Sequence, residues 1–256
     1  MIYVAPTEVT TTMFDYSTAG VDVRDDLKGA HRFIWEHVRS PGAWWTGAER
    51  VAIAAEARRA TTCALCQQRK AALSPVGVSG EHDTLGALPI EIVDVIHRVR
   101  TDPARLSRAW FDGVMRGGLG APAYVELIGV LTLVTGIDYF ARALGVAEQS
   151  LPDPRPGEPS RYLPPSAKAG AAWVPMIAPE DAAGSEADLY GEAAMIPNIV
   201  RALSLVPGES RAMQRSSAAH YLPIAQIPDP TARRALDRMQ IELVAARVSA
   251  LNQCFY

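Results

Sequence analysis

Apolar residues recur at helical spacing through most of the chain, and proline or glycine separates the helical stretches. From Val23 they return every three or four positions until Pro41 and Gly42, which predicts a helix over 23–40. The same period predicts helices over 47–60, 63–73, 91–99, 103–115 and 123–144, and from Ser185 to the C-terminus with a break at 223–230. No convincing strand alternation follows residue 25, so the pattern predicts an all-α fold.

Local capping signals sharpen two of these helix starts. Thr46 and Glu49 have the spacing of a capping box, in which each side chain satisfies a free backbone N–H. Thr61 or Thr62 can act as an N-cap, which would place Cys63 in the first turn of the following helix.

Proline crowding divides the helical pattern into two parts. We interpret 1–22 as an irregular arm, 23–150 as a first helical unit and 185–256 as a second. The segment 151–184 predicts a Pro-rich linker, or a long loop strapped over the surface. Residues 125–140 align without gaps on 241–256, so we expect a duplicated helical core. In this alignment Glu126 falls on Glu242, and Asp138 falls on Cys254.

Charge and composition exclude several classes of function. The 256 residues carry a formal net charge of −3, and no basic block suggests nucleic acid or a membrane surface. The longest apolar stretch, 124–143, contains Glu126, Asp138 and Arg142, which favours a buried amphipathic helix over a membrane span. The N-terminus shows no signal-peptide pattern, and three cysteines do not form a secreted disulfide framework. We expect a cytoplasmic protein.

Cys63 and Cys66 carry the most chemical information. A reactive cysteine needs a lowered thiol pKa, and a helix N-terminus with basic residues nearby lowers it. The i, i+3 spacing places both sulfurs on one helix face, within reach of a disulfide. Alternatives are two inert buried cysteines or half of a zinc site. Zinc generally needs four ligands, and only Cys254 and scattered histidines remain. We favour a redox-active pair and expect neither metal nor cofactor.

His97 is a further candidate because imidazole moves protons near neutral pH. It lies on an otherwise apolar helical face, where a hydrogen-bonded core histidine is the alternative. The other histidines carry no motif: His31, His37, His82 and His220.

The C-terminal motif brings in a family resemblance. Glu242 precedes Cys254 by twelve residues, and Asn252 lies just before that cysteine. This spacing resembles the AhpD-like alkylhydroperoxidases of the carboxymuconolactone decarboxylase superfamily, whose helical bundle carries a Cys-x-x-Cys pair. The sequence stops at Tyr256, one residue before the expected second cysteine, so we expect this second motif to be incomplete.

The first motif resembles the family with departures. Cys63 and Cys66 are present, but Lys70 stands at the family histidine position and Val51 at the glutamate position. Glu56 lies two helical turns before Cys63 and can replace that glutamate. Glu126 matches the family glutamate position in the other repeat and is its rival; either can instead be a capping or salt-bridged glutamate.

The resemblance implies thiol-dependent reduction of a hydroperoxide by a homo-oligomeric enzyme. Cys66 would attack the peroxide, Cys63 would resolve the product as a disulfide, and an external dithiol would reduce that disulfide. Alternatives are a cofactor-independent carboxymuconolactone decarboxylase-like enzyme, with a pocket of His97 and arginines away from Cys66, and a non-catalytic oligomeric scaffold.

Overall fold

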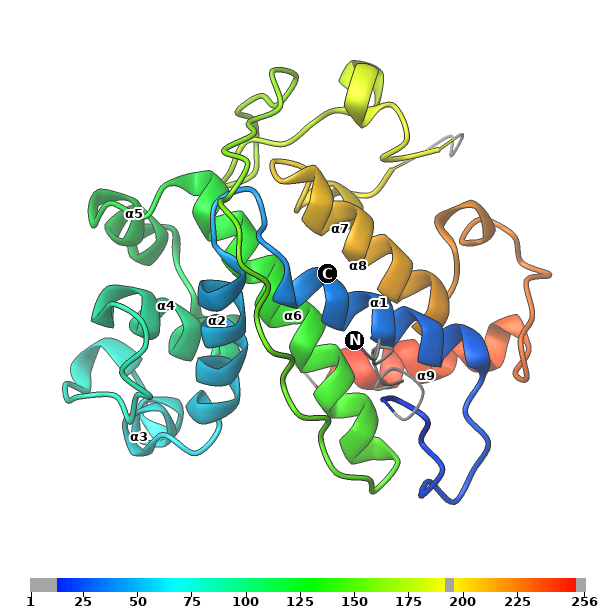
Figure 1. Ribbon diagram of the computed structural model, residues 1–256, viewed down its shortest axis with the longest axis horizontal. Helices are drawn as coiled ribbons and strands as arrows, with labels where there is room; N and C mark the ends of the chain where they lie inside the picture. The colour runs from blue at the N-terminus through cyan, green and yellow to red at the C-terminus, as the bar shows by residue number, and fades with distance from the viewer. Residues whose placement is uncertain (1–12, 192–195, 252–256) are drawn as a thin grey trace, which may run out of the picture.

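A computed structural model describes residues 13–191 and 196–251, and its regular structure is helical (Figure 1). The only β feature in those ranges is one isolated bridge between Lys168 and Met176, which confirms the all-α prediction. The described helices are α1 (Asp25–Arg39), α2 (Gly47–Ala60), α3 (Ala64–Ala71), α4 (Ile90–Thr101), α5 (Arg108–Arg116), α6 (Ala121–Ala143), α7 (Asn198–Arg201), α8 (Pro207–His220) and α9 (Arg238–Leu251).

Helix α6 is the centre of the core. It packs against α1, α2, α4 and α8, and these helices supply the buried apolar side chains around it. Among the described helices, α6 alone is long and apolar enough to cross a membrane. Its buried positions include Val130, Val134 and Ile137, which pack inside the protein, as in the core helix expected from the sequence.

Two buried carboxylates of α6 bind arginines of α2. Glu126 forms an ion pair with Arg50, and Asp138 accepts two hydrogen bonds from Arg58 at 2.7 and 2.9 Å. Buried charges need such partners because an unpaired ion in the interior costs several kcal/mol. The pairs therefore fix α2 against α6 at two levels.

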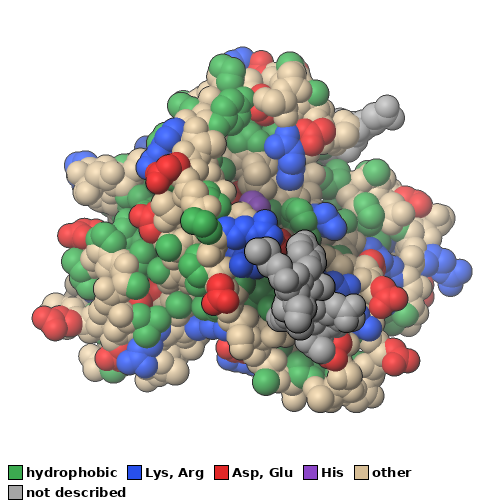
Figure 2. All heavy atoms as spheres, viewed as in Figure 1, with side chains coloured by type: hydrophobic (Ala, Val, Ile, Leu, Met, Phe, Trp, Pro, Cys, Tyr) green, Lys and Arg blue, Asp and Glu red, His purple; other side chains and the backbone are tan. Residues whose placement is uncertain are grey.

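On the face shown in Figure 2, acidic and basic side chains are interspersed.

Several predicted boundaries are corrected by the structure. The helix predicted over 103–115 is a short 3₁₀ turn, Pro103–Arg105, followed by α5, because the Ser107 side chain accepts from the Trp110 N–H and starts a new helix. Helix formation after Ser185 is also less continuous than predicted. In the described residues its first α-helix is the single turn α7, whereas the predicted break at 223–230 lies, as expected, between α8 and α9.

The segment 145–178, here called the strap, contains no helix and lies against the α1–α2 corner. The backbone N–H groups of Arg155, Ser160 and Arg161 donate to carbonyls of residues 39, 42 and 43 at 2.8 to 3.1 Å. Trp35 donates its indole N–H to the Ser150 carbonyl at 2.8 Å. These bonds match the surface-loop alternative, and in Figure 1 this stretch returns alongside α6.

The two segments predicted to be repeats have different surroundings. α6 is the central core helix, whereas α9 has no buried residue. Exposed apolar side chains on α9 include Met239, Leu243 and Leu251. Residues 252–256, which include Cys254, lie outside the described ranges. The duplicated arrangement therefore stays a prediction.

Candidate dithiol and histidine site

Cys63 and Cys66 lie at the start of α3. Cys63 is the N-cap residue, with extended backbone, so the prediction that Thr61 or Thr62 caps this helix is wrong. Both threonine hydroxyls instead donate back to the last carbonyls of α2, those of Arg58 and Arg59. The cysteines are unpaired thiols with relative exposures of 0% and 3%, so this is a buried pair rather than a surface disulfide.

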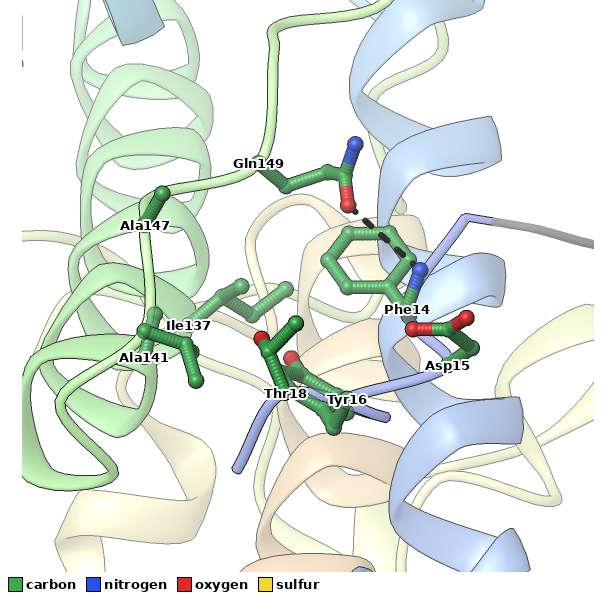
Figure 3. A pocket seen from close by; sticks show the side chains of 9 residues that line it. Phe14, Asp15, Tyr16, Thr18, Ile137, Ala141, Ala147 and Gln149 are labelled. Carbon is green, nitrogen blue, oxygen red and sulfur yellow. Dashed lines mark hydrogen bonds between the residues drawn. The ribbon is translucent and has the colours of Figure 1, made fainter. Parts of the chain in front are cut away.

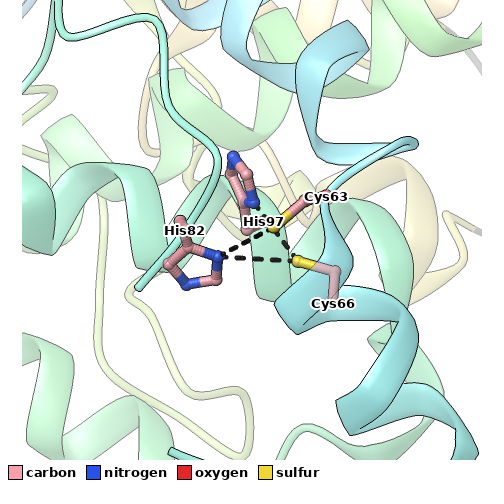
Figure 4. A group of neighbouring side chains, drawn as sticks. All are labelled: Cys63, Cys66, His82 and His97. Carbon is pink, nitrogen blue, oxygen red and sulfur yellow. Dashed lines mark hydrogen bonds between the residues drawn. The ribbon is translucent and has the colours of Figure 1, made fainter. Parts of the chain in front are cut away.

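Two histidines meet this pair from other segments (Figure 4). His97 comes from α4, and its Nδ1 lies 3.2 Å from the sulfur of Cys66. His82 comes from the loop between α3 and α4, and its Nδ1 lies 3.6 Å from each sulfur. Both imidazoles thus present the same ring nitrogen to the thiols.

Each histidine is bound on its other side by a carboxylate. His97 donates from Nε2 to Glu56 of α2 at 2.9 Å, and Glu56 also accepts the backbone N–H of Leu85 at 3.0 Å. His82 donates from Nε2 to Asp94 of α4 at 2.9 Å. Because a carboxylate only accepts, these bonds place a hydrogen on each Nε2 and direct each Nδ1 toward sulfur.

The two imidazoles differ in charge. Burial opposes protonation of His82, but the hydrogen bond to Asp94 and the contacts with both sulfurs raise its pKa to about 10. Burial lowers the pKa of His97, and the nearby His82 charge lowers it further. At neutral pH His82 is therefore an imidazolium, whereas His97 is a neutral base facing Cys66.

Cys63 is the sulfur for which the structure favours the thiolate. Burial opposes ionisation, but hydrogen bonds from the backbone N–H groups of Cys66 and Asp83 and from His82 lower the pKa of Cys63. The Asp83 N–H lies 3.4 Å from its sulfur. A helix N-cap position adds favourable backbone dipoles, so the predicted electrostatic activation acts on Cys63.

The structure brings Cys63, Cys66, Glu56 and His97 together and excludes Glu126 from the group. Glu126 accepts hydrogen bonds from Arg50 and from the backbone N–H groups of Ala43 and Trp44. Its oxygens are engaged in this separate buried network. We therefore drop it as a proton acceptor for the dithiol.

The second predicted motif is not part of this site. Glu242 of α9 pairs with Arg238 at 2.7 Å and accepts from the Tyr221 hydroxyl. Its predicted partner Cys254 lies outside the described residues.

Sequence reasoning missed His82 and Asp94. His82 lies in a loop, where hydrophobic periodicity carries no information, and Asp94 is an ordinary polar position on α4. The available signal was the order Cys-x₂-Cys-x₁₅-His-x₁₄-His formed by Cys63, Cys66, His82 and His97.

A cavity of about 240 Å³ lies beside Cys66. It is lined by Cys66, Thr61 and Tyr139 and by three basic residues, Lys70, Arg100 and Arg142. Lys70, at the family histidine position, is thus part of the cavity wall. Arg100 and Arg142 lie over the Tyr139 ring at 5.2 and 5.3 Å. Of the two cysteines, Cys66 is therefore the one that borders this cavity, beside its basic side chains.

A second small cavity, of about 120 Å³, lies away from the cysteines (Figure 3). The N-terminal residues Phe14 and Tyr16 close it against Ile137 of α6 and Gln149 of the strap. The Phe14 N–H lies 3.4 Å from the Gln149 side-chain oxygen. This contact attaches the start of the described chain to the core.

Comparisons with family models, curated proteins and solved structures return no match.

Proposed function

We propose that the protein is a thiol-dependent peroxidase that reduces hydroperoxides through Cys63 and Cys66. The observation that carries the proposal is the chain Cys66–His97–Glu56, with separations of 3.2 and 2.9 Å. A nucleophile, a base and a group that orients the base are the parts that thiol catalysis requires. The resemblance to the AhpD-like enzymes suggests the same reaction.

In the first step His97 Nδ1 accepts the Cys66 thiol proton, and the thiolate attacks the terminal oxygen of the hydroperoxide. The O–O bond breaks as the S–O bond forms, so the sulfur is oxidised to a sulfenic acid and the peroxide is reduced. The leaving alkoxide takes the proton from His97 and departs as the alcohol. Glu56 is a positioning residue that holds His97 with Nδ1 free.

In the second step the Cys63 thiolate attacks the sulfur of the Cys66 sulfenic acid. The S–S bond forms, and the leaving hydroxide takes a proton from the His82 imidazolium to give water. An external dithiol then reduces the disulfide by thiol–disulfide exchange, becomes a disulfide itself and returns two protons to the site. The cysteines play different parts because Cys66 lines the cavity, whereas hydrogen bonds to its sulfur lower the pKa of Cys63.

The cavity gives an expectation about the substrate. Lys70, Arg100 and Arg142 line it beside Cys66, so a hydroperoxide with an acidic group is favoured over a purely apolar one. A dithiol cycle also needs a reducing compartment, which agrees with the expected cytoplasmic location. A homo-oligomer stays part of the proposal through the family resemblance.

The test is to titrate free thiols in metal-free, reduced protein before and after one equivalent of cumene hydroperoxide. We expect rapid loss of two thiols and a Cys63–Cys66 disulfide in peptide mass spectra. Cys66→Ser abolishes this disulfide, and Cys254→Ser, as the matched control, keeps it. Survival of both thiols would overturn the proposal.

The same titration separates the alternatives. A scaffold role predicts that the buried thiols resist both peroxide and alkylation in the folded protein. A decarboxylase-like role was expected to use a pocket of His97 and arginines away from Cys66. The cavity with Arg100 and Arg142 is instead lined by Cys66, so this observation favours the thiol chemistry.

A further inference from the structure

We propose that Cys63, Cys66, His82 and His97 together bind one Zn²⁺ ion. Their ligand atoms, two sulfurs and two Nδ1 nitrogens, all lie within 4.8 Å of one another. The inference goes beyond the peroxidase proposal: it concerns the same side chains, but it holds whether or not they reduce a peroxide.

The separations match a tetrahedral zinc centre. With Zn–S near 2.3 Å and Zn–N near 2.0–2.1 Å, tetrahedral angles place sulfur about 3.5 Å from nitrogen. The observed separations are 3.6 Å for His82 to either sulfur and 3.2 Å for His97 to Cys66. These three separations therefore lie within a few tenths of an ångström of the tetrahedral value, and the other pairs of ligand atoms lie within 4.8 Å.

The donor set selects the metal. Two thiolates and two imidazoles suit Zn²⁺, whereas Ca²⁺ and Mg²⁺ take oxygen ligands. Four protein ligands leave no open coordination position for water, which is the arrangement of a structural zinc site. All four side chains are buried or nearly so, with His82 only 4% exposed at its side chain.

The carboxylates form the outer layer that zinc-bound histidines usually have. Glu56 accepts from His97, and Asp94 accepts from His82, each at 2.9 Å and each through Nε2. Such bonds fix the tautomer and increase the electron donation of the imidazole to the metal. Arg69 donates to Asp94 at 2.8 Å and holds it in place. An inert pair of buried cysteines would need none of these three bonds.

The position of the four ligands in the fold indicates a structural metal site, because a bound ion would join separate segments. Its ligands come from the start of α3, from the loop before α4 and from α4 itself. The apolar cluster there is small: Cys63, Leu65 and Cys66, with Val78 against it. A metal that joins these segments would supply stability that apolar packing does not, and its binding would be coupled to folding of the loop.

Metal binding also changes the chemistry open to the sulfurs. In the zinc-bound state both thiolates donate to the metal and His97 Nδ1 is no longer free as a base. We therefore expect the zinc-bound protein to resist hydroperoxide, whereas in the metal-free protein the thiols and His97 are free to react. Zinc occupancy would then control the proposed peroxidase reaction.

The test is metal analysis of the full chain after reduction, equilibration with Zn²⁺ and removal of unbound metal by desalting. We expect one zinc per chain. With Co²⁺ in place of Zn²⁺ we expect the thiolate charge-transfer and visible ligand-field bands of a tetrahedral site. Absence of bound zinc, or octahedral cobalt spectra, would overturn the proposal.

Variants identify the ligands. His82→Gln should lower zinc affinity at least tenfold, and Asp94→Asn, which removes an outer carboxylate charge, should lower it about 10–100-fold. His220→Gln is the matched control and should retain one zinc; if His82→Gln also retains it at wild-type affinity, the assignment is wrong. The cobalt spectrum of the unaltered protein keeps the test decisive if a variant does not fold.

The two proposals fail separately. Zinc binding together with metal-free thiols that survive peroxide would remove the peroxidase proposal alone. Thiols that form the disulfide in a protein that binds no zinc would remove the metal proposal alone.

Discussion

His97 donates its Nε2 hydrogen to Glu56 across 2.9 Å, and both side chains are excluded from solvent. This bond links α4 to α2 and leaves Nδ1 directed at Cys66. In either use of the site, as a base or as a metal ligand, His97 depends on Glu56 for the tautomer that makes Nδ1 available.

Replacing Glu56 by Gln should slow hydroperoxide-dependent oxidation of the metal-free dithiol by about tenfold or more, because the amide orients His97 but no longer stabilises its charge. The measurement is the rate of thiol loss as a function of pH. We expect the acid limb of the variant's rate profile to move toward lower pH, since the imidazolium of His97 loses its counter-charge and the pKa of His97 falls further. Glu91→Gln, at an exposed position of α4, is the control. Equal rates and profiles for the two variants would exclude the role given to Glu56.

Replacing Arg50 by Met should destabilise the fold by about 3–5 kcal/mol, the usual cost of removing one partner from a buried ion pair. Arg50 bonds both Glu126 and Glu209, and all three side chains are buried. Without it two carboxylates face each other in the core. Urea unfolding measures the loss. Arg108→Met, which breaks the exposed pair with Asp112, should change stability by no more than about 1 kcal/mol.

Acid should weaken the fold below about pH 6.5, in part through His31. Burial, with the charges of His220 and Arg32, lowers the pKa of His31 to about 3. As pH falls below about 6.5, His31 is therefore protonated in the unfolded chain but still neutral in the folded one. The free energy of unfolding decreases as pH falls from about 6.5 toward 3, at up to about 1.4 kcal/mol per pH unit. Urea unfolding between pH 7 and 5 should show a smaller slope for His31→Gln. An unchanged slope would exclude His31 as the cause.

Two glycines of α6 should respond to alanine in opposite directions. A Cβ at Gly129 would lie 2.5 Å from Oε2 and 2.8 Å from Cγ of Glu209, so Gly129→Ala should cost about 1–3 kcal/mol. A Cβ at Gly136 would meet nothing within 4 Å, and alanine is the better helix former, so Gly136→Ala should stabilise by about 0.5–1 kcal/mol. Thermal unfolding of both variants tests the pair, and the same sign for both would contradict the packing of α8 on α6.

The features predicted correctly from sequence are those set by nearby residues. The Thr46–Glu49 capping box forms as expected, because both partners lie in one helical turn. The apolar period of 123–144 likewise identifies α6. The threonine cap before α3 was wrong because the hydroxyls of Thr61 and Thr62 had a competing local partner, the carbonyls at the end of α2.

Contacts between distant segments were harder to predict. Cys63 and Cys66 were evident as neighbours, and Glu56 and His97 were candidates by residue type. Nothing local indicates that His82 lies beside them, because its position depends on how the loop between α3 and α4 folds back. Glu126 shows the same limitation: its match to a family position did not reveal that Arg50 binds it.

The strap has a consequence for the order of folding. It is held to the α1–α2 corner by main-chain bonds and by contacts such as Arg161 to the Trp44 carbonyl, between residues 117 positions apart. Closing so long a loop costs chain entropy that is recovered only when its docking surface already exists. The corner must therefore be assembled before the strap can bind, and we expect amide hydrogens shared between them to become protected from exchange late in refolding.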